Sequence, residues 1–95
     1  MRLIEITLDV DTITRTGETF DANLVVGFTV INKGSSDCTL HYQGGPALLK
    51  ISKGQSREFN GYSGFVWSKR MQIKFIGSEV GDVEVVKAVT STSEV

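Results

Sequence analysis

Residues 24–31, Leu24-Val25-Val26-Gly27-Phe28-Thr29-Val30-Ile31, are apolar on both faces of an extended chain. That pattern is typical of a central β-strand, which is covered on both sides. Gly27 in the middle of the segment indicates a bulge or the close approach of another backbone. The segment therefore predicts a β-sheet in which this strand is central.

The composition of the whole chain favours strands in the same way. Valine, isoleucine and threonine make up 27 of the 95 residues, whereas alanine supplies only three. β-Branched residues prefer strands and lower helix propensity, and ten glycines against one proline supply many turn positions. Ninety-five residues correspond to one small domain. We therefore expect a single all-β domain.

Alternating apolar residues predict the other strands on both sides of this segment. Ile4, Ile6, Leu8 and Val10 form one face of a half-buried strand, and residues 12–15 form a weak second strand. The turn cluster 32–37 followed by residues 38–42 predicts a hairpin across 24–42. Further strands are expected at 47–51, 56–59 (an edge strand), 71–75 and 83–89.

About eight short strands separated by turn signals are typical of a sandwich or a barrel. We predict a single antiparallel β-sandwich, jelly-roll-like or immunoglobulin-like, over residues 1–89, with a frayed polar C-terminal tail at 90–95. The start of the chain shows no apolar region of a signal peptide. The residues expected in the core are Ile6, Leu8, Leu24, Val26, Phe28, Val30, Leu40, Leu49, Ile51, Ile73, Phe75, Val83 and Val85.

Residues able to carry catalysis or bind a metal are few. The chain has one cysteine and one histidine, too few soft ligands for a zinc site. Cys38 and His41 are three positions apart and point to opposite faces of a strand, so Cys38 is expected in the core and His41 on a solvent or interface face. Asp9 and Asp11 share a strand face, but no calcium-loop pattern surrounds them. We therefore expect no enzyme activity, no metal and no cofactor.

Charge is segregated along the chain. Residues 1–32 have a net charge of −3, residues 50–74 of +5 and residues 75–95 of −3. The basic segment is a candidate contact surface for acidic partner surfaces, or an ordinary solvated face. Nucleic acid is a poor fit, because the whole chain has a net charge of −1. The candidate contact residues of this segment are Lys50, Lys53, Arg57, Lys69 and Arg70.

Four of the eight aromatic residues fall between positions 59 and 67, interleaved with glycines. We expect Phe59 and one of Phe65 or Trp67 inside the domain and Tyr62 outside. Tyr62 and Trp67 are therefore further candidate contact residues. Aromatic rings in such a loop stack on sugars or on a partner protein, so a carbohydrate-binding or adhesion module using residues 62–67 is the alternative function.

Small sandwiches leave strand edges that must be charged, covered or paired. We therefore expect a homo-oligomer or a larger protein assembly rather than a lone monomer. An unpaired cysteine and the absence of a membrane-spanning stretch agree with a cytoplasmic protein.

About 40 residues resemble a turn pattern of small β-sandwich proteins in tailed-phage virions. These are residues 30–40, residues 48–51 and Lys53-Gly54-Gln55-Ser56-Arg57-Glu58-Phe59. In those proteins one strand ends in Asn-x-Gly-Ser, and a turn of the Pro/Lys-Gly-Gln/Glu-Ser type opens a strand that ends in Phe. This chain has Lys53 where proline is frequent, and it has additional aromatic residues after Asn60. The resemblance implies a structural part of a particle, such as a capsid decoration protein or a head or tail accessory, located in the virion.

Overall fold

The computed structural model describes residues 2–61 and 66–94, and within them it contains eight strands and no helix. None of the described segments is therefore a helix long and apolar enough to cross a membrane. The prediction of an all-β domain is confirmed. The strands are β1 Arg2–Arg15, β2 Thr19–Asp21, β3 Val25–Asn32, β4 Cys38–Tyr42, β5 Ala47–Ile51, β6 Ser56–Asn60, β7 Arg70–Phe75 and β8 Val80–Glu94.

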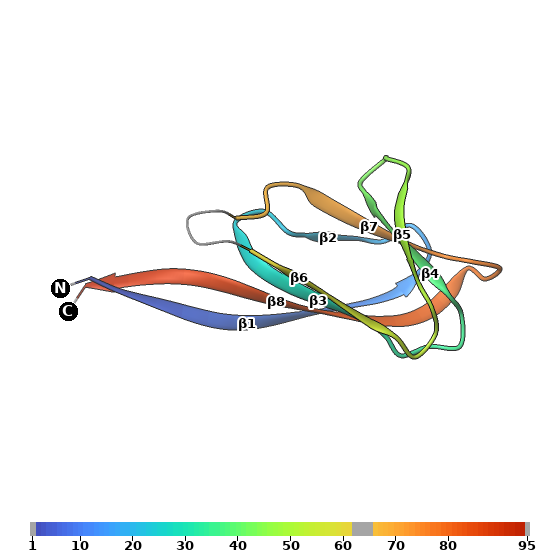
Figure 1. The fold of residues 1–95 in the computed structure, drawn as a ribbon, viewed down its shortest axis with the longest axis horizontal. Coiled ribbons are helices and arrows are strands. Elements are labelled where there is room, and N and C mark those ends of the chain that lie inside the picture. The colour runs from blue at the N-terminus through green and yellow to red at the C-terminus, as the bar shows by residue number, and fades with distance from the viewer. Residues whose placement is uncertain (1, 62–65, 95) are drawn as a thin grey trace.

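The strands form two four-stranded antiparallel sheets that face each other (Figure 1). The first has the order β1-β8-β3-β6 and is called sheet A here. The second has the order β2-β7-β4-β5 and is called sheet B. β1 pairs with β8, β2 with β7, β3 with β6 and β4 with β5, as in one long hairpin that has rolled up. The first half of the chain thus pairs throughout with the second half.

The core lies between the two sheets and is built from alternate residues of both. Most of the predicted core residues are in it, and Leu49 and Val26 are half-buried. Cys38, which was expected in the core, is fully buried. The buried apolar residues are Ile13, Phe20, Ala22, Val25, Phe28, Val30, Cys38, Leu40, Ile51, Met71, Ile73, Phe75, Val83 and Val85.

The orientation predicted for the first strand is wrong. Ile6 and Leu8 were expected in the core but are 66% and 68% exposed, whereas Ile13 is buried. β1 pairs with β8 without a register shift from Arg2 to Ile13, so the odd-numbered residues from Glu5 to Asp11 share the face of Ile13. Ile6, Leu8 and Val10 consequently face outward.

The bulge expected at Gly27 is present and explains a further correction. The register between β3 and β8 shifts between Val25 and Gly27, and a Cβ atom at Gly27 would lie 3.2 Å from the carbonyl oxygen of Phe59. The shift exchanges the two faces of β3, so Val25 is buried before it and Phe28 after it. Leu24, predicted in the core, has φ 63° and is 63% exposed.

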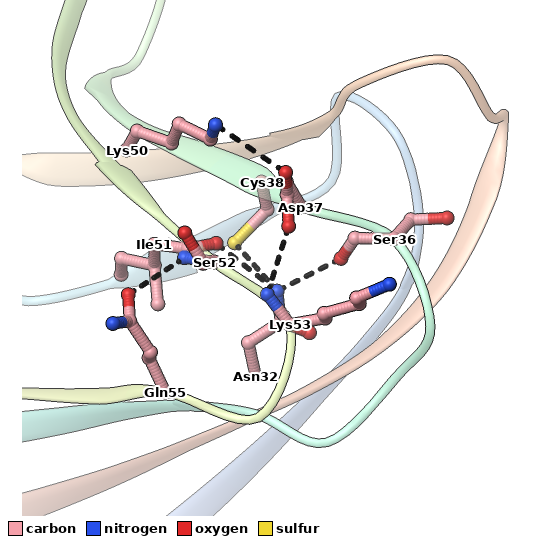
Figure 2. A network of polar contacts seen from close by, with 9 residues as sticks. All are labelled: Asn32, Ser36, Asp37, Cys38, Lys50, Ile51, Ser52, Lys53 and Gln55. Atoms are coloured by element: carbon pink, nitrogen blue, oxygen red, sulfur yellow. Dashed lines mark hydrogen bonds and ion pairs between the residues drawn. The ribbon is translucent and has the colours of Figure 1, made fainter.

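The hairpin predicted across residues 24–42 is also wrong, because β3 lies in sheet A and β4 in sheet B. The chain crosses between the sheets at Asn32, whose side chain is fully buried (Figure 2). The Asn32 amide donates to the carbonyl oxygens of Ser36 at 2.8 Å and Ile51 at 3.1 Å, and its Oδ1 accepts from the Gly34 N–H at 3.2 Å. This asparagine therefore stabilises the crossing instead of a hairpin turn.

The second crossing, from β5 to β6, lies beside the first. The Asn32 backbone N–H donates to the carbonyl oxygen of Gln55, and its carbonyl oxygen accepts from the Gly54 N–H, each at 2.9 Å. The two turns of the phage-like pattern thus meet at one corner of the sandwich. The two turns support each other, since each supplies a hydrogen-bond partner for backbone groups of the other.

The structure has a long axis because β1 and β8 extend beyond the other strands. The principal extents are 52, 23 and 18 Å, and Figure 1 shows both chain ends at the tip of this two-stranded ribbon. β8 continues to Glu94, which pairs with Arg2. Residues 90–94, expected to be a frayed tail, are therefore part of the strand.

Candidate interaction surfaces

The outward face of β1 departs from an ordinary solvated surface, because it exposes large apolar side chains. Ile6, Leu8 and Val10 are 66%, 68% and 53% exposed and succeed one another at every second position. Scattered exposed apolar residues need no explanation, but a contiguous row marks an interaction site. Ile6 and Leu8 of this row were expected in the core because they alternate with polar residues in the sequence.

Neighbouring strands continue this row across sheet A. Leu8 lies opposite Ala88 and Val10 opposite Val86 on β8, and residues opposite each other in an antiparallel pair share a face. We call Ile6, Leu8, Val10, Val86 and Ala88 the outer patch. Charge begins only at its border, where the Lys33 ammonium lies 2.9 Å from the Glu84 carboxylate. An apolar centre with a charged border is the usual composition of a protein interface.

β1 is also an edge strand. It lies at one end of sheet A, and its second edge has no strand partner within residues 2–61 and 66–94. Monomeric proteins usually protect such edges by shortness, proline or bulges. β1 is 14 residues long, and its one register shift is at its far end, between Ile13 and Arg15. Its backbone is therefore open to pairing along most of its length.

The inward face of β1 explains the orientation of the strand. The Lys87 ammonium, with a side chain only 9% exposed, lies 2.7 Å from an Asp11 carboxylate oxygen and 3.7 Å from one of Asp9. It also donates to the carbonyl oxygen of Asp21 at 3.2 Å. A buried ammonium needs such partners, and turning β1 over would remove two of them.

The same contacts decide the role of the aspartate pair. Asp9 and Asp11 were considered as a calcium site, but their carboxylates surround the Lys87 ammonium instead. Within the described part of the chain no group of three or more His, Cys, Asp or Glu side chains is placed to hold a metal ion. The pair is a structural ion-pair cluster.

The predicted basic contact residues are all exposed, but the structure divides them into two groups. Lys50, Lys53 and Arg57 lie at and around the β5–β6 turn. Lys69 and Arg70 lie at the start of β7. The opposite end of β7, at Phe75, pairs with Cys38 of β4, and Cys38 pairs in turn with Ile51 at the end of β5. The five residues therefore do not form one continuous face.

Internal contacts occupy several of these cations. The Lys50 ammonium lies 3.4 Å from the Asp37 carboxylate, which also accepts from the Lys53 backbone N–H at 2.9 Å. That backbone hydrogen bond lowers the pKa of Asp37. Arg70 Nε donates to Thr19 Oγ1 at 2.8 Å, and the Lys69 ammonium lies 5.1 Å from the centre of the Tyr42 ring.

Part of the aromatic segment closes one end of the core. The Phe28 ring stacks on Phe59 with centroids 4.9 Å apart and meets Trp67 edge-on at 5.2 Å. The prediction that Phe59 and one of Phe65 or Trp67 lie inside is confirmed, with Trp67 as the second residue. Tyr62 and Phe65 lie outside the described residues. Because its ring packs on two core aromatics, Trp67 offers a reduced surface for stacking on a sugar.

Cys38 and His41 have structural roles. Burial, and after it the Asp37 charge, raises the pKa of the Cys38 thiol to about 11, so the thiolate nucleophile is scarce near neutral pH. His41 was expected on a solvent or interface face, but it is only 6% exposed. Its Nδ1 donates to the Gly45 carbonyl oxygen at 3.0 Å and its Nε2 accepts from the Thr39 hydroxyl at 2.7 Å. A register shift after Leu40 in the β4–β5 pair accompanies this inward position.

The described residues thus present two kinds of candidate surface: the outer patch with the open β1 edge, and two separated basic groups. A scan of known protein families finds no match to this chain, and a search of the curated proteins finds none either.

Proposed function

We propose that this chain is a non-enzymatic structural and interaction protein, a virion accessory or capsid decoration component of a tailed bacteriophage, which binds other subunits through the outer patch. The observation that carries the proposal is the exposure of Ile6, Leu8 and Val10 in one row on an open edge strand. Nothing in the fold requires apolar residues there, since the core uses the opposite face of β1.

The energetics favour a covered patch. Fully burying an Ile, Leu or Val side chain contributes about 1.5 to 3 kcal/mol. Because the three side chains are between half and two-thirds exposed, covering them would contribute on the order of 3 to 6 kcal/mol. That is a large share of the free energy of a specific protein contact of micromolar affinity, about 8 kcal/mol.

The fold and the turn pattern support the particle role. The order β1-β8-β3-β6 facing β2-β7-β4-β5 supports the jelly-roll variant of the predicted sandwich, an architecture found in viral capsid and lectin domains. The phage-like pattern at Asn32 and at Lys53-Gly54-Gln55 forms the corner that stabilises this arrangement. Both the fold and the turn pattern are compatible with the proposed particle role.

The basic groups fit the border of such a contact. Rim charges set orientation and encounter rate, and they are screened over about 8 Å at physiological salt. If Arg57 and Lys69 meet acidic surfaces of neighbouring subunits, attachment weakens as sodium chloride rises, and Arg57→Glu or Lys69→Glu weakens it further. Attachment that is constant with salt, with both substitutions silent, would leave the outer patch as the contact and remove the basic groups from it.

The test is mass spectrometry of purified virions from the bacterium or phage that encodes the chain. The proposal expects the chain in the particles at a copy number proportional to the shell or tail subunits. Particles reconstituted with a Leu8→Lys variant should lose it, whereas a Leu48→Lys variant, equally altered at an exposed apolar residue of β5, should be retained. Absence from particles, with glycan binding that depends on Trp67, would establish the carbohydrate-binding alternative instead.

A further inference from the structure

We infer that the first occupant of the β1 edge is a second copy of this chain, paired antiparallel along β1 about a two-fold axis at Ile6. The two copies then share one continuous eight-stranded sheet. The inference rests on the proposed function, because it uses the outer patch as a contact surface, and it names the partner.

The edge has the length and regularity that strand pairing needs. Fourteen residues at about 3.4 Å each give β1 an edge of about 45 Å. From Arg2 to Ile13 its pairing with β8 is regular, and the N–H and C=O groups directed away from β8 have no strand partner in the described part of the chain. Figure 1 shows β1 at the outside of the two-stranded ribbon that it forms with β8, and both chain ends lie at the tip of this ribbon.

The row on this strand is complementary to itself. A two-fold axis perpendicular to the sheet keeps the outward face of both copies on one side. With the axis at Ile6, Ile6 lies opposite Ile6 of the second copy, and Leu8 of each copy lies opposite position 4 of the other, which is also an isoleucine. Cross-strand apolar pairs stabilise an antiparallel sheet by about 0.2 to 1 kcal/mol each, in addition to the backbone hydrogen bonds. The two outer patches then lie on one face of the continuous sheet, on either side of the axis, and meet at Ile6.

Charges on the inward face select the register. Glu5, Asp9 and Asp11 alternate with neutral residues there. Among two-fold registers centred on residues 6 to 11, which pair the longest stretches of β1, those centred on residues 7 to 11 each place two acids directly opposite. The pairs are Glu5 with Asp9, Glu5 with Asp11, Asp9 with itself, Asp9 with Asp11, and Asp11 with itself.

The register centred on Ile6 is free of this repulsion. It places Glu5 opposite Thr7 and Asp9 opposite Leu3, with Ile6 opposite Ile6 of the second copy. Like charges directly opposite in a sheet destabilise the pair, so this register is favoured. The open edge at the other side of sheet A, β6, has Ser56, Glu58 and Asn60 on its outward face and offers no apolar row to match β1.

Sedimentation equilibrium tests the association itself. The wild-type chain of 10.4 kDa should show a concentration-dependent mass that approaches twice this value. Ile6→Lys places two ammonium groups opposite each other at the axis and should give a monomer with an unchanged circular dichroism spectrum. Leu48→Lys, on the edge strand β5 of sheet B, is the matched control and should dimerise as the wild type does.

Disulfide trapping tests the register. Ile6→Cys places two cysteines directly opposite, at a Cα separation of about 4.5 to 5.5 Å that suits a disulfide. Leu8→Cys places them four residues apart along the strands, at about 13 Å, beyond disulfide reach. Mild oxidation should therefore cross-link Ile6→Cys and leave Leu8→Cys monomeric on a non-reducing gel, while Cys38 stays buried and reduced in both.

Two outcomes would overturn the inference: a wild-type chain that remains monomeric at millimolar concentration, or equal cross-linking of both cysteine variants. If the wild-type chain is monomeric and is found in particles, and the Leu8→Lys variant is not retained in them, the inference fails and the proposed function stands. If the dimer forms as described but the chain is absent from particles, the proposed function fails and the dimer stands.

Discussion

Replacing Asn32 by alanine should remove the main polar support of the corner where both crossings between the sheets meet. The substitution deletes the amide's hydrogen bonds to the carbonyl oxygens of Ser36 and Ile51 and the one that its Oδ1 accepts from Gly34. Each net hydrogen bond contributes about 1 kcal/mol, and a buried group left without a partner costs about 1 to 3 kcal/mol. Since Asn32 is fully buried, we expect Asn32→Ala to lower the free energy of unfolding by about 3 to 5 kcal/mol.

Urea denaturation followed by Trp67 fluorescence and by circular dichroism measures this change. Trp67 packs on Phe28 in the core, so its emission reports the tertiary structure. Ser35→Ala, at an exposed residue of the same turn, is the matched control and should change stability by less than about 0.5 kcal/mol. A loss below about 1 kcal/mol for Asn32→Ala would refute the assignment of a structural role to this network.

Three other outcomes are expected. Phe28→Ala should cost about 3 to 5 kcal/mol, because Phe28 is buried against Phe59 and Trp67, and an unchanged thermal midpoint would show that it lies outside the core. Asp37 has a lower pKa in the folded chain than its ordinary 3.8, so its stabilisation is present above that value and is lost as pH falls through the folded pKa. Asp37→Asn should therefore flatten the acid limb of a urea-midpoint profile, and an unaltered limb would count against the contact with Lys53. Cys38, with its thiol pKa raised to about 11, should react with Ellman's reagent near pH 8 only after unfolding, and rapid reaction of the folded chain would contradict its burial.

Local patterns were sufficient to predict the strands but not their partners. A continuous apolar run located β3, alternation located β4 and β7, and the glycine within β3 marked the bulge. The hairpin prediction across 24–42 failed because strand pairing depends on distant segments, here β8 and β6 for β3. No short-range signal distinguishes a turn between paired strands from a crossing between sheets; the buried hydrogen bonds of Asn32 make that difference in the folded chain.

The orientation of β1 was unpredictable for a related reason. An alternating strand shows which residues share a face but not which face is inside. The apolar row at Ile6 and Leu8 suggested the core, yet Lys87, 76 and 78 positions away from Asp11 and Asp9 in the chain, needs both aspartates on the inward face. Ile13, on the face of Asp9 and Asp11, was the one local sign that the aspartates face inward.

The candidate contact residues were found in part. The basic residues from Lys50 to Arg70 are exposed as expected, but they lie in two groups, around the β5–β6 turn and at the start of β7, and net charge along the chain does not reveal that separation. The outer patch was missed because exposed apolar rows resemble core rows in sequence. Its identification required the three-dimensional structure.

Carbene footprinting of the outer patch tests the central claim most directly, because the reagent labels exposed side chains whatever their chemistry. Labelling is compared between the chain in its native assembly and the dilute isolated chain. We expect Ile6, Leu8 and Val10 to be strongly labelled in the dilute chain and protected in the assembly, and Leu48 and Ile76 to be labelled equally in both. Unchanged labelling of the three β1 residues in the assembly, with protection at Leu48 instead, would contradict the claim that β1 is the contact surface.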